Sequence, residues 1–567
     1  MASIRFPFLR SAVILAKVAL CSFNRKPQAC ATGAHTTVNH AHACGSRLNE
    51  QSLEQNPRLS GELQLDSMSE KLSVMICISI LQESRRLALA DMLNAGPQAD
   101  LLEIRLDHFL KAPEIGEIIA NQPKPLLMSC RRPQDGGYWK GSEEDRQSLL
   151  RQCIISKADY VEIELDVADQ IRKFPPSRRV ISYTNLTETP RDIAQIYEEA
   201  QKKSPDVIKL TTMARTPEEA WPLVSLVAKQ TVPTVVAGLG KPGVMFIVLG
   251  KKLGAPWTHV ALEKGMENFP GQATVRELET VYHYGAIDRS TRFIGVTGFS
   301  EADTLTVAML NAALAQLELP ARCLPLPMGG VGAFRKVMDA VRLASVVVDA
   351  PHRGQILEAV THPEEAAKEA ESADVIVKQD EQWHGYNTLW RAAISELESV
   401  MKSKSQTEKP LQGRVVMIVG TNAVGRSVAY GVKRRGGTPI FASRDPQAAQ
   451  RTAQSFQCRY VQFEALYTTM HDVLIVCSDE KEKLKPGTSE SGIHPGYLRP
   501  GMAVMDLSVM HQKSKLSRDA ELRGCAVVSP RQVLLGQVDL EVRLITGKEV
   551  RRELLQESLV NTAGPEE

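Results

Sequence analysis

The sequence predicts two α/β folds in succession, a (β/α)8 barrel followed by a nucleotide-binding fold. Eight short apolar runs alternate with helical stretches between residues 75 and 285. Residues 414–444 follow the order strand, glycine turn, helix, strand, which is typical of dinucleotide-binding units. One lysine, Lys209, stands inside an apolar run, where a charge is costly unless it is paired or used in chemistry.

The apolar runs of the first half are the candidate barrel strands. They are ICISI from Ile76, LLEIRLD from Leu101, PLLMSC from Pro125, YVEIELD from Tyr160, RVISY from Arg179, DVIKL from Asp206, VPTVVAG from Val232 and THVALE from Thr258. The chemistry of such barrels lies at the carboxyl ends of the strands. Five polar residues fall near those ends: Glu103, Arg105, Arg131, Thr184 and Lys209.

Several helix starts are marked in the sequence. Residues 216–219 (Thr-Pro-Glu-Glu) form a capping box with proline at the first helical position. Thr189-Pro190 opens a second predicted helix. In the second half, the pattern predicts helices over residues 304–317 and 426–435.

Two interpretations of Lys209 are open from its strand alone. A lysine at the inner end of a barrel strand can act as a nucleophile and form an imine with a ketone. Alternatively, Lys209 lies on an edge strand and extends its ammonium group to solvent. The surrounding pattern of strands and helices favours the imine-forming lysine.

Composition limits the class of protein. The chain has 567 residues, a formal net charge of +2 and ten cysteines without a CxxC pair. The charge argues against a general nucleic-acid partner, and no apolar run is long enough to cross a membrane. The cysteine spacing predicts reduced thiols and no metal site. The sequence does not define an oligomeric state.

The first 74 residues differ from the rest. No acidic residue precedes Glu50, while arginine, lysine, serine and alanine are frequent. This composition resembles an organelle transit peptide. The reduced cysteines lead us to expect a cytoplasmic protein. A plastid location is the alternative if residues 1–70 are a transit peptide. An over-long start before Met75 is another interpretation of the same segment.

The motifs of the first half resemble those of type I 3-dehydroquinate dehydratases. They are EIRLD from Glu103, CRRPQDGG from Cys130, SYTNLTETP from Ser182, DVIKLTTMA from Asp206 and FPGQ from Phe269. The resemblance implies that Lys209 forms an imine with the substrate ketone. It also implies that Glu103, Arg105, Arg131 and Gln272 bind the substrate.

The chain departs from that family at two positions. The family's histidine, which takes the α-proton, falls at Thr184, and its carboxylate-binding arginine falls at Ile247. A threonine hydroxyl is a very weak base, so acid–base help of about 10²–10⁴-fold is expected to be lost. His108 and His259 lie near strand ends, and each is interpreted as either a substitute or a structural histidine.

The glycine turn of the second half is the candidate cofactor site. It comprises Gly420, Asn422, Ala423 and Gly425, with asparagine where the dinucleotide motif has its middle glycine. Backbone N–H groups at such a helix start can face a pyrophosphate. The second strand ends in Ser443 and Arg444, and arginine there suits the 2′-phosphate of NADP. The alternative is a solvated arginine at a strand end.

The second half resembles shikimate dehydrogenases. The matching pieces include APHR from Ala350, GYNT from Gly385, LRPGMAVMDL from Leu498 and the segment 523–548. The resemblance implies that Asn387 and Gln537 bind substrate and that Arg353 takes the position of the family's catalytic lysine. Leu389 takes the position of its aspartate, so the usual lysine–aspartate pair is absent.

Together these features predict four segments. Residues 1–74 are a disordered or targeting N-terminus, 75–288 the dehydratase-like barrel, 289–408 a substrate-binding lobe and 409–567 an NADP-binding domain with returning helices. The implied function is bifunctional: dehydration of 3-dehydroquinate and NADPH-dependent reduction of 3-dehydroshikimate to shikimate. Two alternatives are open, a pseudoenzyme that binds such ligands without turnover and an aldolase-like imine enzyme.

Overall fold

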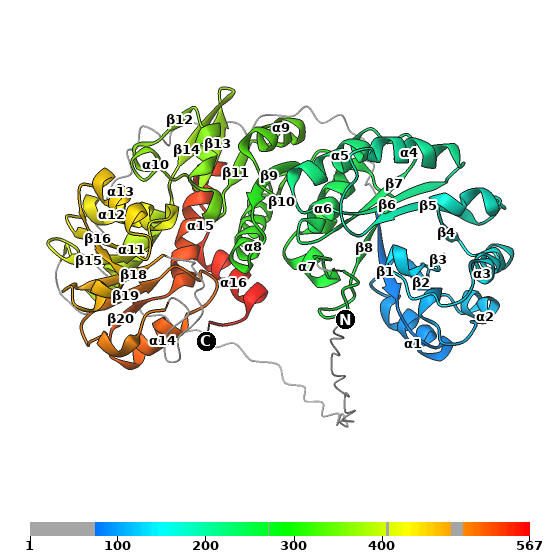
Figure 1. Cartoon of the computed structure of the whole chain (residues 1–567), viewed down its shortest axis with the longest axis horizontal. Helices are drawn as coiled ribbons and strands as arrows, with labels where there is room; N and C mark the ends of the chain where they lie inside the picture. Colours follow the sequence, from blue (N-terminus) through cyan, green and yellow to red (C-terminus); the bar gives the residue numbers. More distant parts are fainter. Residues whose placement is uncertain (1–73, 270, 404–407, 478–491, 567) are drawn as a thin grey trace, which may run out of the picture. The chain divides into compact units, whose positions relative to one another are not determined.

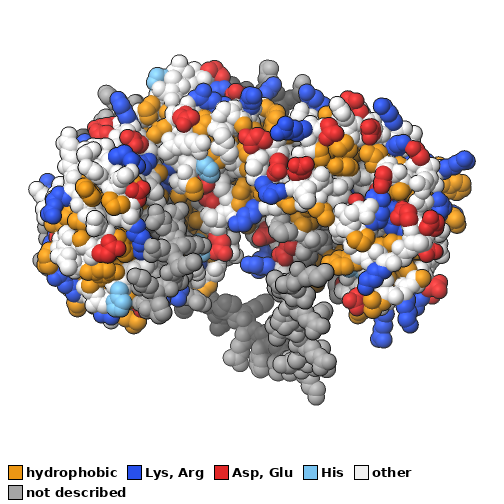
Figure 2. Space-filling model, in the orientation of Figure 1, with side chains coloured by type: hydrophobic (Ala, Val, Ile, Leu, Met, Phe, Trp, Pro, Cys, Tyr) orange, Lys and Arg blue, Asp and Glu red, His pale blue; other side chains and the backbone are white. Residues whose placement is uncertain are grey.

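The computed structural model describes residues 74–269, 271–403, 408–477 and 492–566. The predicted N-terminal targeting segment therefore lies outside the described residues. The described chain forms three sheets, one of eight strands and two of six. Charged side chains of both signs are interspersed on the face shown in Figure 2.

The first sheet is the predicted barrel. All its pairings are parallel, in the order β7-β6-β5-β4-β3-β2-β1-β8, so that the last strand pairs with the first. The strands are β1 (Met75–Ile80), β2 (Leu101–Arg105), β3 (Leu126–Ser129), β4 (Tyr160–Glu164), β5 (Arg178–Asn185), β6 (Val207–Met213), β7 (Thr234–Leu239) and β8 (Trp257–Val260). Each predicted strand is confirmed.

Helices connect these strands and lie outside them (Figure 1). They are α1 (Arg85–Ala95), α2 (Ile115–Ala120), α3 (Glu143–Ile155), α4 (Ile193–Lys202), α5 (Pro217–Ala228), α6 (Gly243–Leu253) and α7 (Val275–Thr280). Pro217 opens α5 as predicted, and Thr216 caps it. The prediction for α4 was wrong at its start, because Asp192 rather than Thr189 is the residue before the first helical turn.

The barrel interior follows from the two-residue alternation of strands. At its base each strand contributes one mainly apolar side chain: Cys77, Leu101, Leu127, Tyr160, Val180, Val207, Val235 and Trp257. Two residues further along each strand, the side chains on the same face are mostly polar: Ser79, Glu103, Ser129, Glu162, Ser182, Lys209, Ala237 and His259. The polar group of the barrel therefore rests on an apolar base.

The second sheet mixes parallel and antiparallel pairs in the order β10-β9-β11-β13-β14-β12. Its strands are β9 (Arg292–Thr297), β10 (Ala321–Leu326), β11 (Ser345–Val347), β12 (His362–Pro363), β13 (Val375–Gln379) and β14 (Gln382–Tyr386). The helices are α8 (Glu301–Gln316), α9 (Val331–Val341), α10 (Glu365–Glu369) and α11 (Leu389–Lys402). Helix α8 begins earlier than expected because Ser300 and Asp303 form a capping box.

The third sheet is wholly parallel, in the order β17-β16-β15-β18-β19-β20. Its strands are β15 (Val415–Val419), β16 (Thr438–Ser443), β17 (Arg459–Gln462), β18 (Val473–Val476), β19 (Ala503–Asp506) and β20 (Ala526–Val528). The helices are α12 (Ala423–Arg434), α13 (Pro446–Ser455), α14 (Lys515–Leu522), α15 (Pro530–Thr546) and α16 (Arg552–Ala563). This is the order of a dinucleotide-binding fold, whose direction reverses between β15 and β18.

Two further properties concern the described residues as a set. The seven cysteines among them are free thiols. No helix within the described ranges combines the length and apolar character needed to cross a membrane.

Candidate active sites

Lys209 lies inside the barrel and is only 1% exposed. Its Nζ is 2.7 Å from Oε2 of Glu162 and 3.6 Å from Oε1 of Glu103. A buried ammonium group is tolerated only when it is paired with charge and hydrogen-bonded. The interpretation of Lys209 as a solvent-reaching residue of an edge strand was therefore wrong.

Glu103 is the most heavily bonded carboxylate in the barrel. Its Oε2 accepts a hydrogen bond from Ser79 Oγ at 2.5 Å. Its Oε1 accepts from Ser129 Oγ and from Arg131 Nη2, each at 2.9 Å. Burial raises the pKa of Glu103, but the charges of Lys209 and Arg131 outweigh burial and hold that pKa well below its usual range.

The same two cations act on Glu162. Burial again raises its pKa, but the positive charges of Lys209 and Arg131 lower it by more, so that the pKa of Glu162 lies below its ordinary value. Arg131 Nε lies 3.7 Å from Glu162 Oε1. The site thus contains two carboxylates held ionised around two cations.

A cavity of about 350 Å³ opens above Lys209. Four predicted site residues line it, namely Glu103, Arg105, Arg131 and Lys209. Five further lining residues are apolar, namely Leu186, Met213, Ala237, Leu239 and Phe269. The predicted cluster at the carboxyl ends of the strands is therefore brought together around one cavity.

Arg105 is fixed by Asp107. Its Nε and Nη2 donate to the two carboxylate oxygens of Asp107 at 3.0 and 2.8 Å. Asp107 also accepts from the backbone N–H groups of Arg131 and Tyr138. The guanidinium group of Arg105 is thereby held at the cavity wall.

His259 also lines the cavity, and its position was left open by the sequence. Its Nε2 accepts a hydrogen bond from Trp257 Nε1 at 3.1 Å, and its Nδ1 lies 3.6 Å from Glu103 Oε2. Burial and the charge of Lys209 lower the pKa of His259 to about 3. The imidazole is consequently neutral at physiological pH.

Thr184 does not line this cavity. It lines a neighbouring cavity of about 650 Å³ with Tyr183, Arg132 and Glu164, and Asp135 lines both cavities. Glu164 is paired with Arg146 at 2.7 Å, but burial prevails and raises its pKa to about 7. Thr184 pairs with Thr211, which lines the Lys209 cavity, so Thr184 lies beside that cavity without being part of its lining.

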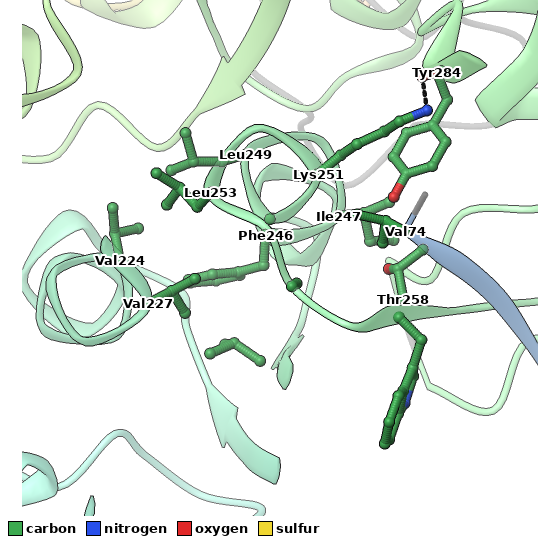
Figure 3. Close-up of a pocket in the computed structure, with 14 residues that line it drawn as sticks. Val74, Val224, Val227, Phe246, Ile247, Leu249, Lys251, Leu253, Thr258 and Tyr284 are labelled. Atoms are coloured by element: carbon green, nitrogen blue, oxygen red, sulfur yellow. Dashed lines mark hydrogen bonds between the residues drawn. The ribbon is translucent and has the colours of Figure 1, made fainter. Parts of the chain in front are cut away.

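Gln272 and Ile247 also lie away from the lining of the Lys209 cavity. Gln272 Oε1 accepts from the backbone N–H of Asn268 at 2.7 Å. Ile247 lies in α6 and lines an apolar crevice with an open volume of about 10 Å³, together with Val74 and Thr258 (Figure 3). A cavity needs roughly 10–15 Å³ to hold one water, so this crevice has almost no free room.

The second group of candidate residues surrounds Arg353, which is 9% exposed. Arg353 Nε donates to the backbone carbonyl of Val348 at 3.1 Å. Asp374 accepts hydrogen bonds from the backbone N–H groups of Thr388 and Leu389, each at 2.7 Å, at the start of α11. The side chain of Leu389 packs in an apolar cluster, so a carboxylate is missing where the resemblance placed one.

Asn387 makes three side-chain hydrogen bonds within the protein. Its Nδ2 donates to the carbonyl of Ser372 at 3.0 Å and to Ser427 Oγ at 2.8 Å. Its Oδ1 accepts from Trp390 N at 3.4 Å. These bonds fix the orientation of Asn387, and its role in substrate binding stays a prediction.

Gln537 faces a carboxyl group that the sequence did not single out. Gln537 Nε2 donates to Glu541 Oε1 at 2.9 Å, one helical turn along α15. Glu541 is 1% exposed, and burial and the negative charge of Asp374 raise its pKa to about 8. Among the described residues, Gln537 Oε1 and Glu541 Oε2 have no hydrogen-bond partner. Only the i,i+4 spacing of these two residues on one helix could have indicated the pair.

The glycine turn lies where the direction of the third sheet reverses. Gly420 has φ +106°, and a Cβ at Gly425 would come within 2.4 Å of the Gly420 carbonyl oxygen. Asn422 caps α12 through Gly425 N at 3.0 Å, and its Nδ2 donates to the Cys477 carbonyl beside β18 at 2.6 Å. The turn is as close-packed as a pyrophosphate-binding turn requires, so Gly420, Asn422, Ala423 and Gly425 fit a dinucleotide.

The carboxyl end of β16 supplies the other predicted cofactor residues. Ser443 is buried, and its Oγ accepts from Asp445 N at 3.1 Å. The guanidinium carbon of Arg444 lies 3.8 Å from the ring centroid of Phe463. Stacking holds the guanidinium plane beside the strand end, where the ribose of a dinucleotide lies in this fold. Arg444 therefore fits a 2′-phosphate.

These sites define a lysine-containing (β/α)8 barrel joined to a dinucleotide-binding fold. A profile for type I 3-dehydroquinase matches residues 76–289. The 3-dehydroquinate dehydratase of Methanopyrus kandleri is 31% identical over 185 residues, which cover 32% of this chain and 84% of that protein. Over its barrel, the chain belongs to the type I 3-dehydroquinase family.

Longer similarities cover both halves. The bifunctional 3-dehydroquinate dehydratase/shikimate dehydrogenase, chloroplastic, of Arabidopsis thaliana is 25% identical over 477 residues, covering 80% of this chain and 79% of that protein. The solved dehydroquinate dehydratase and shikimate dehydrogenase of S. pombe covers 86% of this chain and 98% of its own length, with 16% identity and a TM-score of 0.39.

Proposed function

We propose that the chain is a bifunctional enzyme of the shikimate pathway. The barrel dehydrates 3-dehydroquinate to 3-dehydroshikimate through an imine at Lys209. The second half reduces 3-dehydroshikimate to shikimate with NADPH. The observation that carries the proposal is the buried Lys209, which lies between two carboxylates at the base of a 350 Å³ cavity.

The contacts of Lys209 support imine formation. Attack on a ketone requires the neutral amine, and the carboxylate of Glu162 at 2.7 Å can accept the ammonium proton. Arg131 and Arg105 at the cavity wall supply fixed hydrogen-bond donors for substrate hydroxyl or carboxylate oxygens. Family membership and these contacts agree on the same reaction class.

In the second half, this chain's own residues bind and orient substrate. Arg353 supplies a fixed positive charge that cannot act as a base. The unpartnered Oε1 of Gln537 can accept a hydrogen bond from a substrate hydroxyl. Glu541, which keeps its proton up to about pH 8, can donate one to a substrate oxygen. NADPH supplies the hydride when bound, held by the turn at Gly420 and by Arg444.

A second candidate function concerns the second half alone: it binds its ligands but does not catalyse the reduction. It is favoured by Leu389, which is buried in an apolar cluster. The resemblance to shikimate dehydrogenases implies an aspartate at this position. Binding of NADPH without its oxidation in the presence of 3-dehydroshikimate would support this alternative.

The proposal is tested by adding 3-dehydroquinate and then NADPH to the full chain. We expect the absorbance of a conjugated enone to rise first, and NADPH absorbance to fall afterwards. A Lys209→Ala variant should abolish the first step and leave reduction of added 3-dehydroshikimate intact. Turnover of 3-dehydroquinate by that variant would contradict the proposal.

The remaining assignments are also proposals. We place the domain boundaries at residues 75–288, 289–408 and 409–567, which separate the three sheets. The partners are small-molecule substrates. The location is cytoplasmic, with plastid import as the alternative, and the name of the Arabidopsis relative supports the latter.

A further inference from the structure

The second half contains a carboxylate–histidine pair next to Arg353. His352 Nδ1 lies 2.8 Å from Oδ1 and 2.9 Å from Oδ2 of Asp349, in the turn that follows β11. An ionised carboxylate only accepts hydrogen bonds, so Nδ1 carries a proton and Nε2 is the ring nitrogen that exchanges one. The His352 side chain is 31% exposed, and its Nε2 has no hydrogen-bond partner among the described residues. This nitrogen can therefore take up and release a proton.

Asp349 is held in place by the neighbouring strand. Thr297, the last residue of β9, donates from its Oγ1 to Asp349 Oδ1, and the same Oγ1 accepts from Asp349 N at 2.9 Å. The Asp349 side chain is only 9% exposed. A carboxylate fixed in this way orients the imidazole, selects one tautomer and stabilises the imidazolium form. The pair thus has the geometry of an acid–base unit.

The pair lies where this sheet is expected to bind a ligand. Strand β9 lies between β10 and β11 and is parallel to both, so the chain leaves β9 toward one side of the sheet and leaves β11 toward the other (Figure 1). In open α/β sheets, ligands bind at the carboxyl ends of strands beside such a reversal. Gly298 follows β9, and a Cβ on it would come within 2.7 Å of Asp349 Cβ. The loops after β9 and β11 therefore meet at this edge.

The turn that carries His352 is also close to the predicted cofactor turn. The short turn η6 (Ala350–His352) packs against helix α12. Arg426 of α12 connects the two loops. Its Nη1 donates to the carbonyl of Thr421 in the glycine turn at 3.0 Å, and its Nη2 lies 3.3 Å from the position of a Cβ on Gly354. The imidazole is therefore near both the strand ends and the glycine turn, where a ketone and a hydride donor must meet.

We propose that His352 is the catalytic acid of the second half, with Asp349 as its positioning residue. The proposal rests on the proposed reductase function and extends it. Arg353 carries a charge that does not titrate, and Leu389 has no ionisable group, so the usual lysine–aspartate pair has no counterpart at those two positions. Asp349 and His352 supply an acid–base pair from a single turn instead.

Glu541 has a different part in this arrangement. It is 1% exposed and is bonded to Gln537 within α15, so it holds a substrate oxygen by a hydrogen bond. A group that gives up a proton in every turnover must regain one from water. His352 is exposed enough to do so, whereas the carboxyl group of Glu541 is sealed from solvent.

The step balances with the groups named. Reduction of a ketone needs a hydride at carbon, which NADPH supplies, and a proton at oxygen. As the new C–H bond forms, the pair of the C=O double bond moves to oxygen, and that oxygen takes the proton from Nε2 of the His352 imidazolium. The ketone gains two electrons and the cofactor loses two. The neutral imidazole keeps its Nδ1 proton toward Asp349 and regains the Nε2 proton from water.

Charged groups on several elements surround the pair. They are Arg353 on the same loop, Glu301 and Asp303 at the start of α8, His511 at 2.8 Å from Glu301, and Arg426 on α12. Burial and the charge of Asp349 raise the pKa of Asp303 to about 6, so both carboxylates are ionised at neutral pH and favour the imidazolium. Because the acid must be protonated, kcat for reduction should fall as pH rises through the titration of His352.

The test measures reduction of 3-dehydroshikimate by the full chain between about pH 5.5 and 9. We expect His352→Gln to lose about 100-fold in kcat and to lose the fall of kcat toward high pH, with KM and the Kd for NADPH within about threefold of wild type. The retained Kd also reports a folded protein. His362→Gln, an exposed change on β12, is the matched control.

Asp349 is tested by the position of the titration. Asp349→Asn removes the charge that stabilises the imidazolium, so it should move the midpoint of the pH profile to lower pH by about one unit or more, and Asp349→Glu should recover part of that shift. Imidazole NMR of the protein without substrate or cofactor gives a readout independent of turnover. The signal that is absent from His352→Gln should titrate at lower pH in Asp349→Asn.

Three outcomes would contradict the inference. A kcat for His352→Gln within twofold of wild type, or a His352 signal whose titration is the same in Asp349→Asn, would overturn it alone. A fall toward high pH that persists in His352→Gln and disappears in Glu541→Gln would assign the proton to Glu541 instead. Wild-type protein that binds NADPH without oxidising it would overturn the reductase function and this inference together.

Discussion

The two candidate sites satisfy their buried polar groups in different ways. In the barrel, Lys209 and Glu103 are bonded from several strands, and Glu103 alone accepts three hydrogen bonds. In the second half, Glu541 Oε2 and Gln537 Oε1 have no partner among the described residues. An unpartnered buried polar atom costs about 1–3 kcal/mol. The carboxylates and Lys209 of the barrel site are thus paired before substrate binds, and Arg131 Nε is the one fully buried polar atom of this cluster without a hydrogen-bond partner among the described residues, whereas in the second site the carboxyl group itself is left with an unpartnered oxygen.

The difference arises from the elements that build each site. Strand alternation brings eight side chains to one level of the barrel, so that acids, bases and hydroxyls meet. Helix α15 brings only the i,i+4 pair of Gln537 and Glu541 to the second site. The following predictions, from the largest effect to the smallest, test that comparison.

Ile247→Arg should destabilise the barrel without improving its chemistry. The side chain lies in a crevice of about 10 Å³, so an arginine there would bury an unpaired charge. We expect a loss of about 3–5 kcal/mol in the free energy of unfolding. Chemical denaturation of Ile247→Arg and of the apolar control Ile247→Val measures it. An arginine variant as stable as wild type, with faster dehydration, would show that this position faces substrate.

Arg444→Ala should weaken NADPH binding in the second half. Loss of a charge-assisted contact to the 2′-phosphate should raise the Kd for NADPH about 10–100-fold and leave that for NADH nearly unchanged. Fluorescence titration with both cofactors measures the two constants. Equal losses for both would mean that Arg444 supports the fold through Phe463 instead.

Glu541→Gln should stabilise the protein at alkaline pH. The pKa of Glu541 is raised to about 8 in the folded protein. The folded state therefore holds a proton that the unfolded chain releases above its ordinary pKa of about 4.3, and stability falls as pH rises from there to about 8. Glutamine does not titrate, so the variant should match wild type near pH 4 and exceed its Tm by at least ~3 °C at pH 8.

The exposed Glu549→Gln is the control for this change, because its side chain is 72% exposed. If the Tm difference between Glu541→Gln and wild type did not vary with pH, Glu541 would not be held protonated in the folded protein.

Thr184→Val should have the smallest effect on dehydration. Thr184 lines the neighbouring 650 Å³ cavity rather than the Lys209 cavity, and a threonine hydroxyl is a very weak base, so we expect less than a twofold change in kcat. A tenfold loss would place Thr184 in the reaction.

The sequence predicted the strands better than the side-chain partners. All eight barrel strands could be recognised, because each is a short apolar run whose limits are marked by polar residues. The cluster of Glu103, Arg105, Arg131 and Lys209 followed from one rule, that the carboxyl ends of parallel strands meet. These residues lie on strands, whose alternation fixes where side chains point.

Residues outside the strands were predicted less well. Ile247 lies on a helix and Gln272 in a loop where Gly271 has φ +86°, so neither orientation follows from alternation. The role of His259 depends on a bond to Trp257, which local patterns do not reveal. Glu541 was missed because a single carboxylate on an amphipathic helix is usually exposed.

The most direct test of the account is intact mass after mixing the protein with 3-dehydroquinate and borohydride. We predict one covalent adduct per chain, mapped to Lys209 and absent from Lys209→Ala. Lys203→Ala, at a partly exposed lysine that pairs with Asp169, should retain it. Wild-type protein without an adduct, or an adduct that persists in Lys209→Ala, would contradict the central claim that Lys209 forms the imine.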